Sequence, residues 1–425
     1  MDAWRECKLG DLLEIKHGFP FLGENFGDSG THIVLTPGNF FDDGGFKHKG
    51  DREKWYRGPI PSDYVLNAGD VIVAMTEQAE GLLGSSAIIP CNGIYLHNQR
   101  LGLVQLRDTA RTDSRYVYYL FNSKTVRQQI RASASGTKIR HTAPSRIASV
   151  NVRVPPVATQ RCIASILSAY DELIGNCQRR IKLLESMARA LYREWFVRFR
   201  FPGHESVPRV PSPFGEIPKG WEVTTLNAHL AALESGKRPK GGIRDVKDGV
   251  PSIGAENING IGQHDFASEK FIPREFFQEM RKGVVQHGDV AIYKDGAYIG
   301  KSSYFRDGFP HAECCVNEHV FLLRASGIRL RQNALYLWLQ EPDTVQTIRS
   351  KNANAAQPGI NQQTVGGLEL ILPDSQIASR FDQVVDPLLA EVINLARKVR
   401  NLRRTRDLLL PRLLSGQIEV EGSAS

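Results

Sequence analysis

Few side chains in this sequence have the types and spacing that catalysis requires. The segment GDVAIYKDG brings Asp289 and Lys294 close together, and a Mg²⁺-dependent nuclease gathers carboxylates, often with a lysine, around its metal. The matching segment GDVIVAMTE contains Asp70 but lacks the lysine. We therefore interpret Asp70 and Asp289 as turn residues, because Gly-Asp supports a tight turn that the aspartate side chain caps.

A second group, His311, Cys314, Cys315 and His319, could bind a metal ion. Adjacent cysteines form a poor chelating pair, and CCVNEHVFLL has the apolar character of a buried strand. We expect core packing there and no metal site. The six cysteines include no CxxC pair, which argues against a zinc or disulfide framework and favours a reducing compartment.

Other catalytic signatures are missing from the sequence. A DNA methyltransferase needs Asp or Asn before Pro-Pro and an aromatic residue, whereas RVPPVA has Val on both sides of its two prolines. We find no P-loop, no Ser-His-Asp candidate and no paired acid/base carboxylates. We therefore expect a chain that is not itself an enzyme and binds no cofactor.

Size and charge indicate a large basic protein. A length of 425 residues predicts two or three domains. The formal net charge of +8 and the pI of about 9.1 favour a polyanionic partner such as DNA. The N-terminus has no apolar signal core, and no run approaches the roughly 18 apolar residues that span a bilayer, so we expect a cytoplasmic protein without a membrane segment.

The two halves of the sequence resemble each other in a series of landmarks in the same order. NAGDVIVAM, from Asn67, matches QHGDVAIYK, from Gln286, about 219 residues later. HNQRLGLVQLR parallels VNEHVFLLR, and VNVRVP followed by a glutamine parallels LELILP followed by another. Several matches in register indicate an internal duplication.

Each repeat ends in a long amphipathic segment. Apolar residues of the first segment alternate at spacings of four and three, which is typical of a coiled-coil seam. The second seam has one residue of slip near Val392, Arg406 at a seam position and Pro387, which predict a local kink or unwinding; Pro411 and Gly416 should end it. The residues that we expect to pair the two helices are Ile163, Leu167, Tyr170, Ile174, Ile181, Leu184, Leu191, Val384, Leu388, Leu395, Val399, Leu402 and Leu409.

These patterns predict an α+β protein with two pseudo-repeated globular domains and an antiparallel intramolecular coiled coil of two long helices. A coiled coil between two chains remains the alternative, because the apolar spacing of a helix does not determine which helix packs against it. The expected boundaries are a first domain over 1–156, a first helix over 157–200, a linker over 201–220, a second domain over 221–374, a second helix over 375–416 and a tail over 417–425.

Two similar modules held at a fixed separation suit a duplex, whose half-sites recur each helical turn. Arg and Lys read guanine edges or hold phosphates, and Asn and Gln read adenine edges. The loops that differ between the two halves supply the candidate DNA-binding residues Asn98, Arg100, Lys138, Arg140, His141, Lys237, Arg238, Lys240, Lys294, Lys301, Gln357, Asn361 and Gln362.

The order of domain, helix, domain, helix resembles the specificity subunit of type I restriction-modification enzymes. VPPVATQRCIASILSAYDELI and LPDSQIASRFDQVVDPLLAEVI carry the resemblance, together with LLESMARALYREWFVRF and RDLLLPRLLSGQIEV. The resemblance implies that each domain is a target recognition domain for one half of a bipartite, asymmetric DNA sequence, and that the helices set the spacing between the halves.

The resemblance also implies partners. The helices would dock two methyltransferase subunits that use S-adenosylmethionine, and restriction and translocase subunits that use ATP and Mg²⁺ would complete the enzyme. Two other functions remain open from the sequence. One is a stand-alone nuclease or methylase with an unfamiliar site, and the other is a scaffold whose globular parts bind protein.

Overall fold

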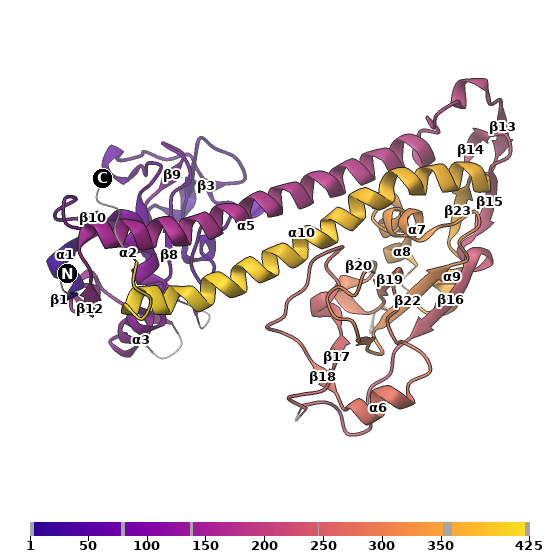
Figure 1. Cartoon of the computed structure of the whole chain (residues 1–425). Coiled ribbons are helices and arrows are strands. Elements are labelled where there is room, and N and C mark those ends of the chain that lie inside the picture. Colours follow the sequence, from indigo (N-terminus) through magenta and orange to yellow (C-terminus); the bar gives the residue numbers. More distant parts are fainter. Residues whose placement is uncertain (1–3, 78–80, 137–138, 245, 352–358, 421–425) are drawn as a thin grey trace. The chain divides into compact units, whose positions relative to one another are not determined.

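The computed structural model describes residues 4–77, 81–136, 139–244, 246–351 and 359–420. The chain divides into two compact units: unit 1 combines 1–172 with 403–425, and unit 2 comprises 173–402. Figure 1 labels the two long helices, α5 (Val157–Tyr192) and α10 (Ser375–Ser415). Both helices contribute residues to both units.

Unit 1 is built on a four-stranded sheet of order β2-β10-β6-β8. A second sheet has the order β3-β5-β4-β9, and β1 pairs with β12 and β11 with β7. The strands are β1 (Arg5–Lys8), β2 (Leu13–His17), β3 (Phe26–Gly27), β4 (His32–Val34), β5 (Trp55–Tyr56), β6 (Val71–Ala74), β7 (Thr76–Glu77), β8 (Ser86–Ile88), β9 (Tyr95–Leu96), β10 (Leu101–Leu106), β11 (Arg140–His141) and β12 (Asn151–Val154). The short helices are α1 (Leu9–Leu12), α2 (Ser114–Phe121), α3 (Lys124–Ala132) and α4 (Pro144–Ala148).

Unit 2 repeats this topology. Its four-stranded sheet has the order β16-β22-β19-β20, its second sheet the order β18-β17-β21, and β15 pairs with β23 as β1 does with β12. The strands are β13 (Arg209–Ser212), β14 (Gly215–Pro218), β15 (Glu222–Thr225), β16 (Leu230–Ser235), β17 (Val250–Ile253), β18 (Phe271–Ile272), β19 (Asp289–Tyr293), β20 (Ser302–Phe305), β21 (Cys315–Val316), β22 (Val320–Ala325) and β23 (Glu369–Leu372). The short helices are α6 (Arg274–Glu279), α7 (Gln332–Trp338), α8 (Pro342–Ser350) and α9 (Gln362–Gly366).

The predicted Gly-Asp turn occurs in both units with the same geometry. Oδ2 of Asp70 accepts a hydrogen bond from the backbone N–H of Asn67 at 2.8 Å, and Oδ2 of Asp289 accepts one from Gln286 at 2.8 Å. The preceding glycines have φ values of 90° and 87°, which residues with a Cβ rarely adopt. The duplication and the α+β class predicted from the sequence are confirmed.

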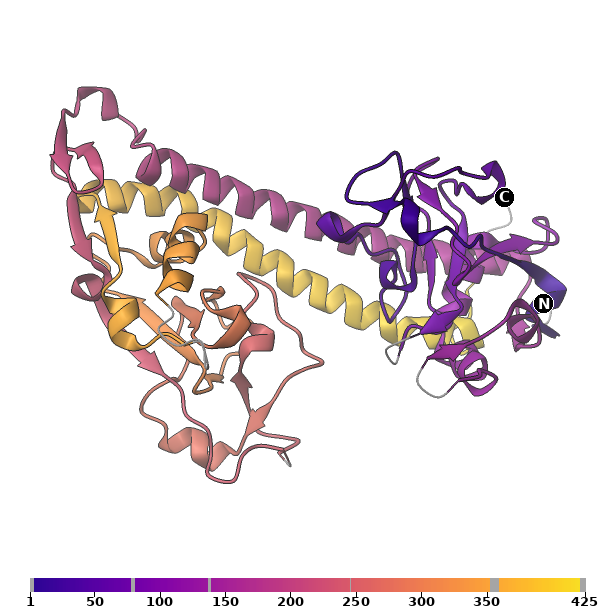
Figure 2. The same cartoon turned by 180° about the vertical axis from the view of Figure 1, so that it is seen from behind.

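In unit 2 the two long helices pack side by side and antiparallel (Figures 1 and 2). Ile174 and Cys177 of α5 share a buried cluster with Leu395 and Val399 of α10. Just beyond the end of α5, Phe196 packs against Phe381 of α10, with ring centroids 4.7 Å apart. Higher numbers on one helix therefore meet lower numbers on the other, as an intramolecular antiparallel pair requires.

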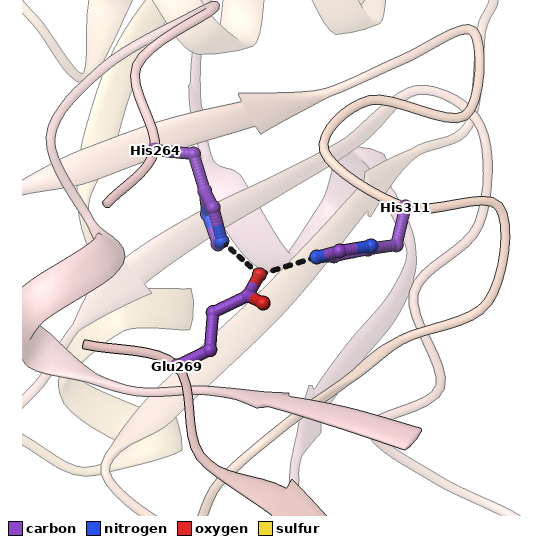
Figure 3. A group of neighbouring side chains, drawn as sticks. All are labelled: His264, Glu269 and His311. Atoms are coloured by element: carbon purple, nitrogen blue, oxygen red, sulfur yellow. Dashed lines mark hydrogen bonds and ion pairs between the residues drawn. The ribbon is translucent and has the colours of Figure 1, made fainter. Parts of the chain in front are cut away.

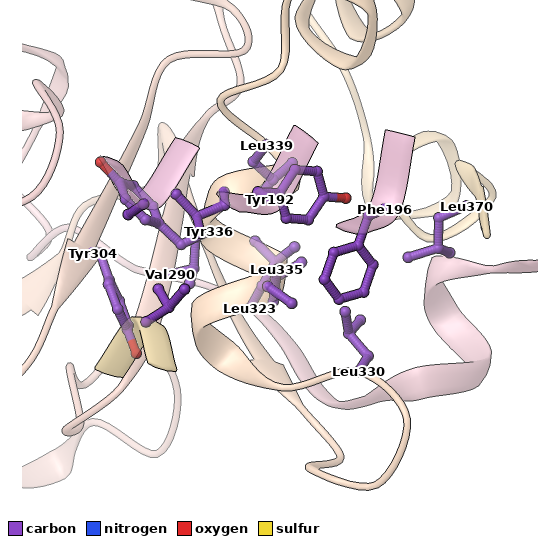
Figure 4. Close-up of a cluster of buried hydrophobic side chains, with 14 of the residues drawn as sticks. Tyr192, Phe196, Val290, Tyr304, Leu323, Leu330, Leu335, Tyr336, Leu339 and Leu370 are labelled. Carbon is purple, nitrogen blue, oxygen red and sulfur yellow. The ribbon is translucent and has the colours of Figure 1, made fainter. Parts of the chain in front are cut away.

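The end of α5 also joins the core of unit 2. Tyr192 and Phe196 pack among Leu330, Leu335 and Leu339, as Figure 4 shows. Beyond α5, Arg193–Val197 continues as a π-helical turn. Burial of these large apolar side chains stabilises the junction between helix and domain, since each contributes about 1.5–3 kcal/mol.

In unit 1 the same two helices meet through other residues. Ile163 and Leu167 of α5 belong to one buried core with Leu413 and Leu414 of α10. Among the other predicted pairing residues, Tyr170, Ile181, Leu184, Leu191, Leu402 and Leu409 are partly buried. The first seam is therefore placed as its spacing predicts.

The prediction for the second seam was wrong near its start. Val384 is 47% exposed, whereas the next residue, Val385, is fully buried. With Val385 in place of Val384, the buried or half-buried positions Phe381, Val385, Leu388, Val392, Leu395, Val399 and Leu402 alternate at four and three without a slip. The error arose because two adjacent valines satisfy the pattern almost equally in the sequence.

The prolines do not interrupt the second helix. Helix α10 runs unbroken from Ser375 through Pro387 and Pro411 to Ser415, so neither proline unwinds or ends it. Both side chains are exposed, so the ring contacts no core. Gly416, with φ of 75°, follows the last helical residue in the left-handed conformation common after helices.

The segment 201–220, which we expect to be a linker, contains regular structure. Strands β13 and β14 pair as an antiparallel hairpin, with Val210 opposite Ile217. Phe201 and Ile217 are buried, and the ring of Phe201 stacks on Trp221 at 5.4 Å. The segment is therefore part of the unit 2 fold.

We find no helix in the described part of the chain with both the length and the apolar character of a bilayer-spanning segment.

Candidate nucleic-acid interface

In unit 1 the structure brings Arg100, Arg140 and His141 to the two sides of one short segment. The backbone N–H of Met75 donates to the carbonyl of Arg100 at 3.0 Å, and its carbonyl accepts from Thr142 at 2.9 Å. Arg140 and His141 form β11, which pairs with β7. All three side chains are exposed. We call these residues, together with Met75–Glu77, edge 1.

Unit 2 has the same backbone arrangement around Lys294. The N–H of Lys294 donates to the carbonyl of His319 at 3.1 Å, and its carbonyl accepts from Ile360 at 3.0 Å. Lys294 thus occupies the place of Met75, and His319 that of Arg100. We call Lys294, Asp295, His319, Ile360 and Asn361 edge 2. The two edges share a backbone frame and differ in nearly every side chain.

Three predicted amide readers are used for folding. Asn98 is only 9% exposed, and its Oδ1 accepts from the N–H of Arg100 at 3.0 Å; Asn317 makes the same turn in unit 2. Oδ1 of Asn361 caps α9 by accepting from Thr364 at 2.8 Å. The side-chain amide of Gln362 donates to the carbonyl of Leu233 at 3.0 Å.

The basic candidates of unit 2 differ in exposure: Lys294 is half-buried, with Nζ 4.9 Å from the centroid of the Phe321 ring. Lys237 and Lys240 are exposed. Nη2 of Arg238 lies 3.1 Å from Oε1 of Glu318, one residue before His319. Nζ of Lys301 lies over the ring of Tyr298, at 4.4 Å from its centroid. Lys138 and Gln357 fall outside the described residues.

Edge 2 also carries acidic groups. Nδ1 of His319 lies 2.7 Å from Oδ2 of Asp295, and its Nε2 lies 3.3 Å from Glu318. The carboxylates hold the imidazole and partly neutralise the basic side chains. Edge 1 instead has Glu77, a buried carboxylate that accepts from the backbone N–H groups of Gly81 and Leu83.

His319 is not among the DNA-binding residues predicted from the sequence, where this histidine was interpreted only as a possible metal ligand. Tyr298, which is 51% exposed beside Lys301, is not among them either. The signal that could have found His319 is the alignment of HNQRLGL with VNEHVFL, which places it opposite Arg100.

A buried histidine precedes Arg100 of edge 1 in the same turn. His97 is fully buried, and Nε2 donates to the carbonyl of Leu101 at 2.9 Å. Burial lowers the pKa of His97 to about 4, although the hydrogen bond to Leu101 acts in the opposite direction. The imidazole is therefore neutral at pH 7 and supports the turn before β10.

A groove of about 1500 Å³ lies elsewhere in unit 1. Residues of α3 and of α10 line it, among them Arg127, Asp171 and Arg406. None of the described DNA-binding candidates lines this groove. The groove and edge 1 are therefore separate features.

Two histidines and a glutamate converge in unit 2, as Figure 3 shows. Nε2 of His264 lies 2.6 Å from Oε1 of Glu269, and Nε2 of His311 bonds to the same oxygen. Burial lowers the pKa of His264, against the effect of Glu269. In the sequence His311 lies close to Cys314 and Cys315, but both cysteines are buried around β21, as expected for core residues.

The comparisons with known proteins agree with this architecture. Residues 1–186 match the family model of the type I restriction modification DNA specificity domain. The chain is 25% identical over 309 residues to the type I restriction enzyme MjaIX specificity subunit of Methanocaldococcus jannaschii, covering 72% of this chain and 70% of that protein. It is 20% identical over 443 residues to the EcoBI specificity subunit of Escherichia coli, covering 100% and 88%.

A solved structure shows the same fold. The crystal structure of the type I restriction-modification system S subunit from M. genitalium has a TM-score of 0.61 and 16% sequence identity, and the match covers 97% of this chain and 96% of that one. In sequence and in the order of its domains and helices, this chain is therefore similar to the specificity subunits of type I restriction enzymes.

Proposed function

We propose that this chain is the DNA sequence-recognition subunit of a type I restriction-modification complex. Residues 1–156 and 221–374 each bind one half of a bipartite, asymmetric duplex target. The long helices set the spacing and dock two methyltransferase subunits, and restriction and translocase subunits join them. The chain itself is non-catalytic; S-adenosylmethionine, ATP and Mg²⁺ act on the partner subunits, in the cytoplasm.

One observation carries the proposal: the two edges repeat a backbone frame while their side chains differ. Met75 and Lys294 make equivalent hydrogen bonds, yet one is apolar and the other cationic. Arg100 and His319 also occupy equivalent places, where an exposed guanidinium in unit 1 corresponds to a half-buried imidazole in unit 2. Different side chains on equal frames are what an asymmetric target requires.

The chemistry of edge 1 suits a groove of DNA. Arg100 and Arg140 are exposed arginines on neighbouring chain segments, and a guanidinium donates two hydrogen bonds to O6 and N7 of guanine or to phosphate. His141 lies beside them, with Nδ1 3.2 Å from Oγ1 of Thr76. Edge 2 offers Lys294 and His319, and Lys301 lies nearby in the same unit.

The test uses the chain assembled with its methyltransferase subunit, because the complex is the active form in this proposal. Selection from random duplexes, read out by adenine methylation, should return a split motif. Arg140→Ala and Arg100→Ala should relax or lose the half-site read by unit 1 and leave the other half unchanged. Lys294→Ala should do the reverse.

Arg107 offers a matched control in unit 1. It follows the opposite end of β10 from Arg100, is half exposed and pairs with Glu14 at 2.7 Å. Arg107→Ala should leave both half-sites unchanged. A complex that methylates random duplexes without preference would contradict the proposal, and unchanged motifs in all edge variants would favour a protein-binding scaffold.

A further inference from the structure

We propose that His264, Glu269 and His311 form a binding site for a divalent cation of the zinc type. This inference rests on the structure of unit 2 and does not depend on the proposed DNA-binding function.

The three side chains come from two separate loops. His264 and Glu269 lie in the segment between Asn257 and β18, and His311 lies between β20 and β21. Their potential ligand atoms all lie within 4.8 Å of one another. Figure 3 shows the two imidazoles pointing at the carboxylate from different directions. Two loops that are remote in sequence thus direct three Lewis-basic atoms to one point.

The site is enclosed on one side and open on another. The side chain of His264 is 1% exposed, that of Glu269 is 11% exposed, and that of His311 is 21% exposed. The ring of Phe266 packs edge-on against both imidazoles, with centroid distances of 4.5 Å to His264 and 5.7 Å to His311. The exposed part of His311 leaves a path for a metal ion and for a water ligand.

The donor set selects the kind of metal. Two imidazole nitrogens and one carboxylate oxygen, with a water as fourth ligand, match tetrahedral Zn²⁺ coordination, whereas Ca²⁺ and Mg²⁺ prefer sites made of oxygen. Ligand atoms of a tetrahedral zinc ion lie about 3.3 Å apart, given bonds of about 2.0–2.1 Å. The carboxylate of Glu269 therefore retracts by less than about 1 Å to admit the ion.

A bound metal would connect the loop of His264 and Glu269 to the loop of His311. The loop of His264 packs on α10 through Gly262, where an added Cβ would lie 3.1 Å from Val392 and from Ala396. The guanidinium of Arg400 covers Phe266 at 3.9 Å. An ion that joins His264 and Glu269 to His311 would therefore fix both loops against α10. Holding two loops together in this way stabilises the folded state.

The experiment uses the untagged full chain, freed of metal with a chelator and dialysed. Titration with Zn²⁺ alone should show one equivalent bound and raise the midpoint of thermal unfolding of unit 2 by roughly 5–10 °C at a hundredfold excess over the dissociation constant. Co²⁺ should give the intense visible absorption of a tetrahedral site. A chelator should reverse both effects, so the metal-free and metal-bound states of the unaltered chain can be compared directly.

His311→Gln and Glu269→Gln should weaken Zn²⁺ binding by about 100-fold or more and remove the Co²⁺ spectrum. Circular dichroism without metal should match the unaltered chain, which separates loss of the site from loss of the fold. The matched control is His287→Gln, an exposed histidine beside Asp307 at 3.4 Å, and it should bind Zn²⁺ normally. Failure of the unaltered chain to bind Zn²⁺, or equal loss in His287→Gln, would mean that the three residues form a hydrogen-bonded cluster only.

Discussion

Arg406 of α10 donates a hydrogen bond to Asp171 of α5, with Nη1 2.6 Å from Oδ1, inside unit 1. The other oxygen of Asp171 accepts from the hydroxyl of Tyr119 at 2.6 Å. A charged residue at a position of the apolar seam is thereby paired with a residue of the opposite helix. Arg406 is therefore compatible with the pairing of the helices, and its ion pair with Asp171 fixes the register of α5 against α10.

The first prediction concerns this pair. Arg406→Leu leaves Asp171 half-buried without its cation and should lower the free energy of unfolding by about 1–2 kcal/mol. The double variant Asp171→Leu with Arg406→Leu should recover most of that loss, because leucines suit the seam. Urea denaturation of the unaltered chain, the two single variants Arg406→Leu and Asp171→Leu, and the double variant gives the coupling energy. As a control, the exposed pair Arg107 and Glu14 should couple by less than about 0.5 kcal/mol; equal couplings would contradict the prediction.

Adjacent valines test the corrected seam. Val385→Asp places a carboxylate in the buried core of unit 2 and should cost about 3–5 kcal/mol of unfolding free energy. Val384→Asp places the same carboxylate in water and should change the unfolding free energy by less than about 0.5 kcal/mol. Comparing the unfolding free energies of the two variants under the same conditions shows which of the two valines lies in the buried seam. A larger loss in Val384→Asp would restore the seam that the sequence suggested.

His97 predicts a pH dependence of stability. Its pKa is about 4 in the folded protein, against 6.5 when unfolded, so between these values the unfolded chain binds a proton that the folded chain does not. The contribution of His97 to the free energy of unfolding is therefore fully present above pH 6.5 and is lost as the pH falls toward 4. From pH 7 to pH 5 it should fall by about 2 kcal/mol.

The measurement compares urea unfolding of the unaltered chain with that of His97→Gln at several pH values. Gln retains a donor for the carbonyl of Leu101 but has no titrating group in this range. The difference in unfolding free energy between the two proteins should narrow as the pH falls from 7 to 5. A difference that stays constant with pH would show that His97 does not titrate as described.

The proposed role of the helices as a spacer makes a fourth prediction. Insertion of one heptad into each helix, at the level of Cys177 and Leu395, adds about 10 Å of helix and keeps the seam in phase. The tolerated gap between half-sites should then lengthen by about three base pairs while the half-sites stay the same. Methylation mapping of the complex reads both properties at once. An unchanged gap would refute the spacer.

The sequence was sufficient for features that repeat or alternate. Asp70 and Asp289 could be paired as equivalent turns because each follows a glycine before an apolar strand. The first seam, from Ile163 to Leu191, could be predicted because its apolar residues alternate at spacings of four and three without interruption. The hairpin in 201–220 was not foreseen, since its prolines and glycines resemble those of a linker and its burial depends on Trp221.

The sites were harder to predict than the fold, because they depend on contacts between remote segments. Arg100 and Arg140 were both candidates, but only the backbone hydrogen bonds of Met75 to Arg100 and Thr142 show that their segments flank Met75. Asn98 and Asn361 were chosen for their amides, which the fold uses for a turn and a cap. His264 and His311 could not be connected at all, because no sequence pattern relates two loops on either side of β19 and β20.

The central claim is that equivalent edges of the two units read different halves of one DNA target. The most direct test maps adenine methylation by the complex assembled with the unaltered chain, with Arg140→Ala and with Lys294→Ala. The account predicts a split motif in which each variant relaxes only one half, and a different half in each case. A motif that stays intact in both variants, or that loses both halves in either one, would contradict it.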